Sequence, residues 1–200
     1  MDLSQLTTLL NIVFVAAIAE NMSLYYFLGT CPLISVSSEL TTAFHMGITV
    51  TFVMLVSAAI NYVIYYFILI PLNIEFLQLL FFVLTIATIT QLLEQFLDRF
   101  LPEIYAAFGI FLPLIAVNCA ILGACIFVIN REYSFIESVA YALGSGLGWS
   151  LVICLMASIR RRLDMTKVPE YLGKTGITML IAAIMAMAFS GLSQIIGGGI

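Results

Sequence analysis

Residues 109–123 read GIFLPLIAVNCAILG, a stretch without a charged side chain that sets the fold class of the whole chain. An apolar run of this kind, continued by further apolar residues on its C-terminal side, is typical of a helix that crosses a membrane. The run is nevertheless interrupted by Gly109, Pro113, the pair Asn118-Cys119 and Gly123. Glycine weakens a helix, and proline removes a backbone hydrogen bond from it. The stretch therefore predicts a membrane helix that is broken along its length.

The composition of the full chain supports the same interpretation. Of its 200 residues, 63% are hydrophobic and 9% are charged, whereas a soluble domain carries about 25% charged residues. A water-soluble globule of this size cannot bury so much apolar surface. The sequence therefore predicts an all-α integral membrane protein that forms a single membrane domain over residues 1–200. The formal net charge of −4 argues against a nucleic-acid-binding protein, which needs a basic face.

Apolar stretches of membrane-spanning length recur along the chain. A transmembrane helix needs about 20 predominantly apolar residues, so the chain has room for six such helices joined by short loops. We predict spans at about Leu6–Leu28, Thr42–Tyr62 with a possible extension to Ile70, Phe76–Leu97, Ile104–Ile129, Phe135–Ile159 and Gly176–Ile195.

The basic residues predict how these spans are oriented. Cytoplasmic loops of membrane proteins collect Lys and Arg. The loop after the fifth span holds Arg160–Arg162, Lys167 and Lys174, and Arg99 lies on the same side, whereas Arg131 alone lies on the other. We therefore expect the loop after the fifth span in the cytoplasm and both termini on the outer side of the membrane.

The two halves of the chain resemble each other. Residues 18–21 (IAEN) and 115–118 (IAVN) are 97 positions apart, and residues 43–47 (AFHMG) stand at the same offset from residues 140–144 (AYALG). Three-span repeats, here about 1–97 and 98–200, have opposite orientations in the membrane. Inverted repeats with broken helices are a transporter architecture whose working site lies near the midplane.

The first span of each half is predicted to be broken. In the first half, Gly29-Thr30-Cys31-Pro32 closes the span, and the interruptions in residues 109–123 break the corresponding span of the second half. Corresponding Gly/Pro-interrupted segments point to a binding site between the repeats. The alternative is that these residues reflect the general enrichment of Gly and Pro in membrane helices.

Polar residues within the apolar stretches are candidates for an ion pathway. Glu20 and Asn21 lie deep in the first span, and Asn118 occupies the position equivalent to Asn21. A carboxylate in lipid is costly, so Glu20 should face the bundle interior or a partner. Glu20 then either lines an ion or proton path or holds a broken helix together. Glu94 and Asp98 mark either a solvated helix end or a cation entry point.

The cysteines allow two interpretations. Cysteine in an apolar helix is most simply a small hydrophobic residue, which suits Cys154. Cys31 and Cys119 lie at the interrupted segments, and Cys125 rivals Cys119 because residues 122–125 (LGAC) echo residues 28–31 (LGTC). Two thiolates cannot complete a four-cysteine iron–sulfur site, so a cluster here would need two more ligands from another chain.

Several motifs resemble one family of membrane proteins. These motifs are residues 20–22 (ENM), 27–31 (FLGTC), 93–99 (LEQFLDR), 109–121 (GIFLPLIAVNCAI) and 144–149 (GSGLGW). In order and over nearly the whole chain they resemble the family that provides the E-type subunit of the Na+-translocating NADH:quinone oxidoreductase and the A-type subunit of the Rnf electron-transport complex. Residues 20–22 and 144–149 favour the quinone reductase. The chain departs from the family at residues 37–39 and 71–75, away from the cysteines.

The resemblance implies a fold, a partner and a cofactor. It implies a six-helix inner-membrane protein paired with a homologous D-type subunit of opposite orientation, in a six-subunit complex that also contains A-, B-, C- and F-type subunits. Cys31 and Cys119 match the cysteines that share a [2Fe–2S] centre with the D-type subunit. Glu94 matches an acidic position of the sodium path. Flavins, NADH and quinone would be bound elsewhere in the complex, and no complete active site would lie on this chain.

The expected function is thus electron transfer across the membrane coupled to Na+ export, as one subunit of an oxidoreductase. Two alternatives remain. One is the A-type subunit of an Rnf complex, which would couple ferredoxin to NAD. The other is a redox-inert secondary transporter built on the inverted repeat, which would work without partners and without iron.

Overall fold

The computed structural model of the protein describes residues 3–37, 39–100, 112–163 and 173–197. All regular structure within these residues is helical, which confirms the all-α prediction. The elements in chain order are α1 (Leu3–Phe14), the π-helix η1 (Val15–Ala19), α2 (Thr30–Val36), α3 (Leu40–Ile64), the π-helix η2 (Tyr65–Leu69), α4 (Ile70–Leu72), the 3-10 helix η3 (Glu75–Leu77), α5 (Gln78–Phe100), α7 (Leu112–Ala116), α8 (Cys119–Asn130), α9 (Phe135–Leu163) and α10 (Gly173–Gly197).

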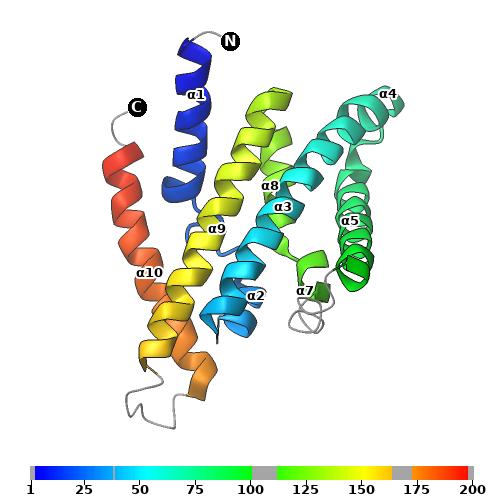
Figure 1. The fold of residues 1–200 in the computed structure, drawn as a ribbon. Coiled ribbons are helices and arrows are strands. Elements are labelled where there is room, and N and C mark those ends of the chain that lie inside the picture. Colours follow the sequence, from blue (N-terminus) through cyan, green and yellow to red (C-terminus); the bar gives the residue numbers. More distant parts are fainter. Residues whose placement is uncertain (1–2, 38, 101–111, 164–172, 198–200) are drawn as a thin grey trace.

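Helices α3 and α9 form the centre of the bundle. They run in opposite directions, and they make the most extensive contact between any two described elements. Helix α5 packs against α3, and α10 packs against α9, on opposite sides of this central pair (Figure 1). Helix α1 with η1 also lies along α9, and α8 lies along α3. The hydrophobic core therefore lies between α3 and α9, where they pack against α1 with η1 and against α8.

Four of the described helical segments are long and apolar enough to cross a membrane. They are Leu40–Leu72, Gln78–Phe100, Pro113–Asn130 and Phe135–Leu163, and two shorter apolar segments run over Gln5–Ala19 and Thr175–Gly191. The second predicted span thus takes its longer form. Helix α10 covers the sixth predicted span, and the start of the fourth lies outside the described residues.

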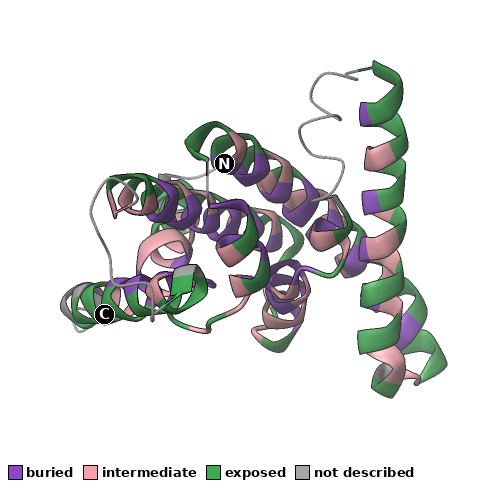
Figure 2. Cartoon of the chain, turned by 90° about the horizontal axis from the view of Figure 1, so that it is seen from below, coloured by how far each residue is buried: buried purple, intermediate pink, exposed green. Residues whose placement is uncertain are grey.

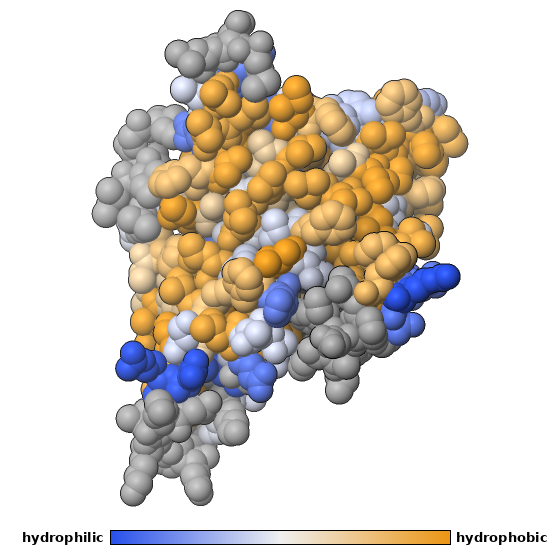
Figure 3. Space-filling view, in the orientation of Figure 1, coloured by the Kyte–Doolittle hydropathy of each residue, from blue (hydrophilic) through white to orange (hydrophobic). Residues whose placement is uncertain are grey.

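The outer surface of the bundle is apolar, as a lipid-facing surface must be. Buried residues gather between the helices and exposed residues cover their outward faces (Figure 2). Large hydrophobic side chains stand on these faces, among them Phe67 and Phe76, which are 76% and 86% exposed. The face in Figure 3 is hydrophobic over most of its height, and hydrophilic residues gather toward the end where α5 and α9 finish. Exposed apolar area of this extent marks a membrane or partner surface.

The first predicted span was wrong in its length. We expected one helix over residues 6–28, closed by Gly29-Thr30-Cys31-Pro32, but the helix ends at Ala19. Residues 20–29 have no regular helix, and Thr30 begins the short helix α2. The break is therefore earlier and longer than the sequence suggested, and the residues expected to close the span instead open a new helix.

Asn21 explains much of this early break. Its Nδ2 donates a hydrogen bond to the carbonyl of Ala17 at 2.9 Å, and its Oδ1 accepts one from the Ser23 amide at 3.0 Å. Asparagine side chains that bind neighbouring backbone groups compete with the helical ladder. The chain then turns at Gly29, whose φ of 77° lies in the left-handed region that glycine adopts without cost.

Small residues allow the helices to approach closely around α9. A Cβ atom on Gly144 or Gly148 would lie 2.6 or 2.5 Å from the carbonyl oxygens of Val13 and Ala17. A Cβ atom on Gly146 would lie 2.8 Å from the Thr51 side chain on α3. The glycines of residues 144–148 therefore serve two packing faces, one toward the first helix and one toward α3, as expected for small residues in membrane bundles.

Gly148→Val is therefore expected to destabilise the protein. Its new side chain meets backbone that cannot move away easily, and overpacking of this kind costs about 1–3 kcal/mol. Thermal unfolding of the purified protein in detergent measures the loss. Gly191→Val is the matched control, because a Cβ atom on Gly191 of α10 meets nothing within 4 Å. Equal losses in the two variants would contradict the packing assignment.

Candidate functional site

The breaks of the two halves meet inside the bundle. The first break covers residues 20–29, and the second separates α7 from α8 at residues 117–118. The Gly29 amide, at the end of the first break, donates a hydrogen bond to the sulfur of Cys119 at 2.9 Å. The carbonyl oxygen of the same Gly29 accepts a hydrogen bond from the indole Nε1 of Trp149 on α9 at 3.3 Å. Gly29 thus joins three elements that are far apart in sequence.

Only glycine fits at position 29. Its backbone is left-handed, and a Cβ atom would lie 2.7 Å from Nε1 of Trp149, 2.9 Å from Cβ of Ala120 and 3.0 Å from Oδ1 of Asn118. Real Cβ atoms essentially never come this close to non-bonded atoms. The first break is therefore pressed directly onto the start of α8.

Asn118 caps helix α8 in the way its sequence position suggests. Its Oδ1 accepts a hydrogen bond from the Ala120 amide at 3.0 Å, which satisfies one of the free donors of the first helical turn. Asn21 binds the amide two residues after it in the same way. The side chain of Asn118 is buried, and its Nδ2 has no hydrogen-bond partner within the described part of the chain. Each asparagine therefore stabilises the break in which it lies.

The structure brings Cys31 and Cys119 to the same region. Cys31 lies two residues after Gly29, in the first turn of α2, and is exposed. Cys119 is the first residue of α8, is partly exposed, and accepts the Gly29 hydrogen bond. The positive end of the α8 dipole favours negative charge at that position. Both predicted ligands therefore flank one backbone turn, and each leaves surface free for another chain.

Cys125 and Cys154 have different environments. Cys125 is buried in α8, where its sulfur accepts a hydrogen bond from Nδ2 of Asn61 at 3.3 Å. Cys154 lies on α9, away from both breaks in sequence. Among the described residues, no group of three or more His, Cys, Asp and Glu side chains could hold a metal ion. Two cysteines from this chain would therefore have to be completed by ligands from a partner.

Glu20 faces an ion-pair partner rather than lipid. Its Oε2 lies 2.6 Å from an Nη atom of Arg131, in the loop between α8 and α9, and both side chains are 30% exposed. The Arg131 guanidinium also donates to the hydroxyl of Tyr133 at 3.3 Å and lies over the ring of Tyr141. The sequence predicted that Glu20 needs a partner, but it gave no means of choosing Arg131.

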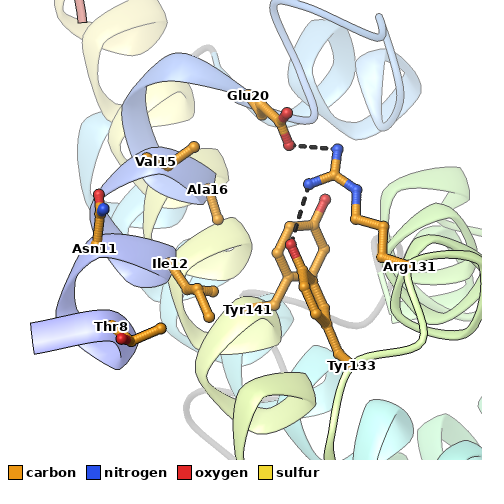
Figure 4. Close-up of a pocket in the computed structure, with 9 residues that line it drawn as sticks. All are labelled: Thr8, Asn11, Ile12, Val15, Ala16, Glu20, Arg131, Tyr133 and Tyr141. Atoms are coloured by element: carbon orange, nitrogen blue, oxygen red, sulfur yellow. Dashed lines mark hydrogen bonds and ion pairs between the residues drawn. The ribbon is translucent and has the colours of Figure 1, made fainter. Parts of the chain in front are cut away.

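This ion pair closes one wall of a cavity of about 140 Å³ (Figure 4). The hydroxyl of Tyr141 is buried and has no hydrogen-bond partner among the residues that the structure describes. The walls combine α1, η1, the Arg131 loop and α9, and the lining residues are Thr8, Asn11, Ile12, Val15, Ala16, Glu20, Arg131, Tyr133 and Tyr141. Both charges and four further polar side chains of this lining can bind water or a small ion.

The surroundings of Arg131 favour its charged form. Burial alone would lower the pKa of Arg131, but its hydrogen bond with Tyr133 and its ion pair with Glu20 outweigh burial and raise the pKa above its ordinary value. Arg131 is also the one basic residue that the charge distribution placed on the outer side. That isolated charge was the available signal for this site, and sequence reasoning did not connect it with Glu20.

Glu20→Gln is expected to lower the free energy of unfolding. It deprives Arg131 of its carboxylate, and hydrogen bonds to charged groups are worth about 1.5–3 kcal/mol. Partial exposure of the pair places the loss at the lower end of that range. Denaturation of the purified protein in detergent measures it. Glu39→Gln, which changes a carboxylate at the start of α3, is the control, and an equal loss there would show that the ion pair adds nothing.

Glu94 lies away from both the cavity beside Glu20 and the contact between the two breaks. Glu94 lies near the C-terminal end of α5, partly buried, one turn before the exposed Asp98. It lines neither the Glu20–Arg131 cavity nor the contact between the two breaks. Of the four ion-pathway candidates, Asn21 and Asn118 hold the breaks, Glu20 faces the cavity, and Glu94 stands apart.

Arg160 has a contact that sequence reasoning missed. It donates to the carbonyl oxygen of Ile34 at 2.9 Å and to the hydroxyl of Ser37 at 2.6 Å. Both acceptors lie at the C-terminal end of α2, where helix carbonyls lack partners. Arg160 therefore holds the short helix that carries Cys31 against α9. The predicted loop position of Arg160–Arg162 was wrong, because α9 continues to Leu163 and these residues form its last turn.

Apolar helices of membrane-spanning length, together with interrupted segments that meet inside the bundle, define a polytopic helical membrane protein. The chain matches the family described as "Rnf-Nqr subunit, membrane protein" over residues 9–196. The chain therefore belongs to the Rnf-Nqr family.

Named relatives cover almost the whole chain. It is 42% identical to the E-type subunit of the Na(+)-translocating NADH-quinone reductase of Nitrosomonas europaea, over 95% of this chain and 99% of that protein. It is 44% identical to the protein of the same name from Serratia proteamaculans, over 90% of this chain and 94% of that protein. It is also 44% identical to the A-type subunit of the Na(+)-translocating ferredoxin:NAD(+) oxidoreductase complex of Acetobacterium woodii, over 93% and 97%.

Proposed function

We propose that this chain is the E-type membrane subunit of a Na+-translocating NADH:quinone reductase in a bacterial inner membrane. Identity of 42% to a protein of that name along almost its full length carries the proposal. The chain contributes no catalytic residue for hydride transfer or quinone chemistry. Its part is to hold half of an electron relay within the membrane and to form a section of the Na+ route.

A transport assay of the whole complex tests this proposal. The tagged chain is purified with its partners and reconstituted into liposomes that contain a quinone. We expect NADH oxidation to reduce the quinone, to accelerate with added Na+, and to drive Na+ uptake that an uncoupler does not abolish. A chain that purifies alone and transports an ion without a redox partner would instead be a secondary transporter.

We further propose that Cys31 and Cys119 hold one half of a [2Fe–2S] centre, and that the homologous D-type subunit supplies the other half. Cys31 is exposed, Cys119 is partly exposed, and the Gly29 N–H already points at the Cys119 sulfur. Hydrogen bonds of this kind support cluster thiolates. The two cysteines and the Gly29 amide are therefore chemically suited to hold half of a [2Fe–2S] centre. Such a centre accepts and donates one electron. The buried Cys125, bound by Asn61, does not suit this role.

We infer that the chain consists of two inverted repeats and that this site lies where their broken helices meet. At an offset of 97 residues, η1 (15–19) corresponds to α7 (112–116), α3 (40–64) to α9 (135–163), and α5 (78–100) to α10 (173–197). Asn21 and Asn118, at that offset, each accept a hydrogen bond from the backbone amide two residues further on. These correspondences support two repeats, about 1–97 and 98–200, whose first helices are broken.

With this inverted repeat we also propose a topology of six membrane spans. The Leu3 end of α1 and the Gly197 end of α10 lie at one end of the bundle, whereas the Phe100 end of α5 and the Leu163 end of α9 lie at the other (Figure 1). Arg99 and Arg160–Arg162 thus share one end, which we assign to the cytoplasm. Both termini then face the periplasm, and the cavity beside Glu20 and Arg131 belongs to the periplasmic half.

For the Na+ route we propose three successive locations in the bundle. Glu94, near the cytoplasmic end of α5, receives the ion, since carboxylate oxygens replace the hydration shell of hard cations. Asn21 and Asn118 lie at the breaks in the middle, and the cavity beside Glu20 opens toward the periplasm. The separation of these residues supports a route through the bundle rather than one site.

Glu94→Gln is expected to raise the Na+ concentration that half-saturates turnover by roughly tenfold, which corresponds to about 1.4 kcal/mol of binding free energy. Steady-state turnover of the purified complex against Na+ concentration measures it. Asp98→Asn, one turn further along α5 and exposed, is the matched control. A similar change in both variants would assign the effect to the charge of the helix end rather than to Glu94.

The second candidate is the A-type subunit of an Rnf complex, which the 44% identity to the protein from Acetobacterium woodii supports. The two candidates differ in the redox partners of the complex and not in this chain. Purified complex that oxidises ferredoxin with NAD+, and does not reduce quinone with NADH, would establish the Rnf assignment.

A further inference from the structure

Trp149 occupies a position that packing alone does not explain. It is the one tryptophan of the chain, lies on α9 and is fully buried. Its indole N–H is directed at the carbonyl oxygen of Gly29. A buried indole normally finds a hydrogen-bond partner, and here the partner is the residue whose amide binds the Cys119 sulfur.

Both backbone polar groups of Gly29 are hydrogen-bonded to side chains. Its carbonyl accepts from Trp149 at 3.3 Å and its amide donates to Cys119 at 2.9 Å. The turn before it is closed by the Leu28 amide, which donates to the Met22 carbonyl at 2.9 Å. A glycine rotates easily about φ and ψ, so these bonds decide which way its amide points. Without the indole bond, the buried Gly29 carbonyl keeps only the intrahelical bond that an N-cap residue accepts in the first turn of α2, and the backbone before it is freer to reorient.

We propose that Trp149 is a positioning residue that holds the Gly29 amide on the Cys119 sulfur and thereby raises the reduction potential of the centre. The proposal rests on the proposed function, in which Cys119 is a ligand. Hydrogen bonds to cluster sulfurs are among the factors that set the potential. The reduced cluster carries one more negative charge, so a donor beside the sulfur stabilises the reduced state more than the oxidised state.

The most direct test removes the indole N–H group of Trp149 and keeps the shape of its side chain. Benzothienylalanine, in which sulfur replaces the indole nitrogen, is incorporated at position 149 by nonsense suppression in the complete complex. Trp149→Phe is made in parallel. The readouts are iron content and the midpoint potential, followed by paramagnetic resonance during a redox titration. The relevant signal is the one that Cys119→Ala removes.

The expected result is an iron content equal to that of the wild type and a midpoint potential shifted to lower values in both variants. Asn61→Leu is the matched control. It removes the other buried N–H donor to sulfur that the described residues contain, at Cys125, and it should leave the potential unchanged.

Three results separate this proposal from the proposed function. An unchanged potential in the benzothienylalanine complex, with normal iron, would overturn the role of Trp149 and leave the cluster assignment intact. Failure of this isosteric complex to assemble or to retain iron would also overturn it, because Trp149 would then be required for structure. Absence of the signal from the wild-type complex would refute the cluster assignment itself.

Discussion

Cys119→Ala is expected to stop NADH-driven quinone reduction by the complex, and Cys31→Ala is expected to do the same. In the proposed function, each removes one ligand of a shared centre. Substitution of residues that merely support metal ligands already costs about 10–100-fold in activity or affinity, so loss of a ligand should cost about 100-fold or more. Quinone reduction and Na+ uptake should fall together, because in the proposed relay the electrons pass through this centre.

The remaining cysteines provide matched controls for this result. Cys125 is buried against Asn61, and Cys154 lies on α9, so Cys125→Ala and Cys154→Ala should keep turnover within a few-fold of the wild type. Both proteins must assemble with their partners, which copurification shows. A loss in Cys125→Ala as large as that in Cys119→Ala would contradict the choice of ligands.

Gly29→Ala is expected to have the largest effect on stability. Its φ of 77° lies where a side chain is strained, at a cost of about 1–3 kcal/mol. The new Cβ atom would also lie within 3.0 Å of Trp149, Ala120 and Asn118, which adds about 1–3 kcal/mol of overpacking. The complex should therefore lose assembly or unfold at a clearly lower temperature, as thermal scanning in detergent would show.

Gly173→Ala separates the two contributions. Gly173 has a similar φ of 63°, but a Cβ atom on it would meet nothing within 4 Å. This variant should lose only the backbone term, while Gly29→Ala loses both. Equal losses would mean that the contact of the first break with α8 is looser than the structure shows.

Sequence patterns predicted the fold class because the membrane imposes it. Long apolar runs have few alternatives to helix when no water can bind their backbone. The second span was confirmed for this reason. The break between α7 and α8 was also predicted, since Asn118 disfavours a continuous helix. Two of the other expected interruptions were wrong as breaks, because Pro113 lies in the first turn of α7 and Gly123 lies within the continuous helix α8.

Local patterns failed where a distant residue decides the outcome. The first break begins at Glu20, nine residues before the predicted Gly29, because Asn21 turns its side chain onto the backbone and Glu20 pairs with Arg131. Nothing in the apolar run of residues 6–28 reveals that partner. Trp149 likewise reads as a core residue until its hydrogen bond to Gly29 is seen. The contacts of Glu20 with Arg131 and of Trp149 with Gly29 span more than 100 residues and depend on the tertiary fold.

In the proposed function, the two breaks of this chain present Cys31 and Cys119 as half of an iron–sulfur centre. The decisive measurement is the content of iron and acid-labile sulfide in the copurified pair of this chain with its homologous partner. We expect both elements in the wild-type pair and their loss in Cys31→Ala and Cys119→Ala, but not in Cys125→Ala. A wild-type pair that is intact, purified without oxygen, and free of iron would contradict it.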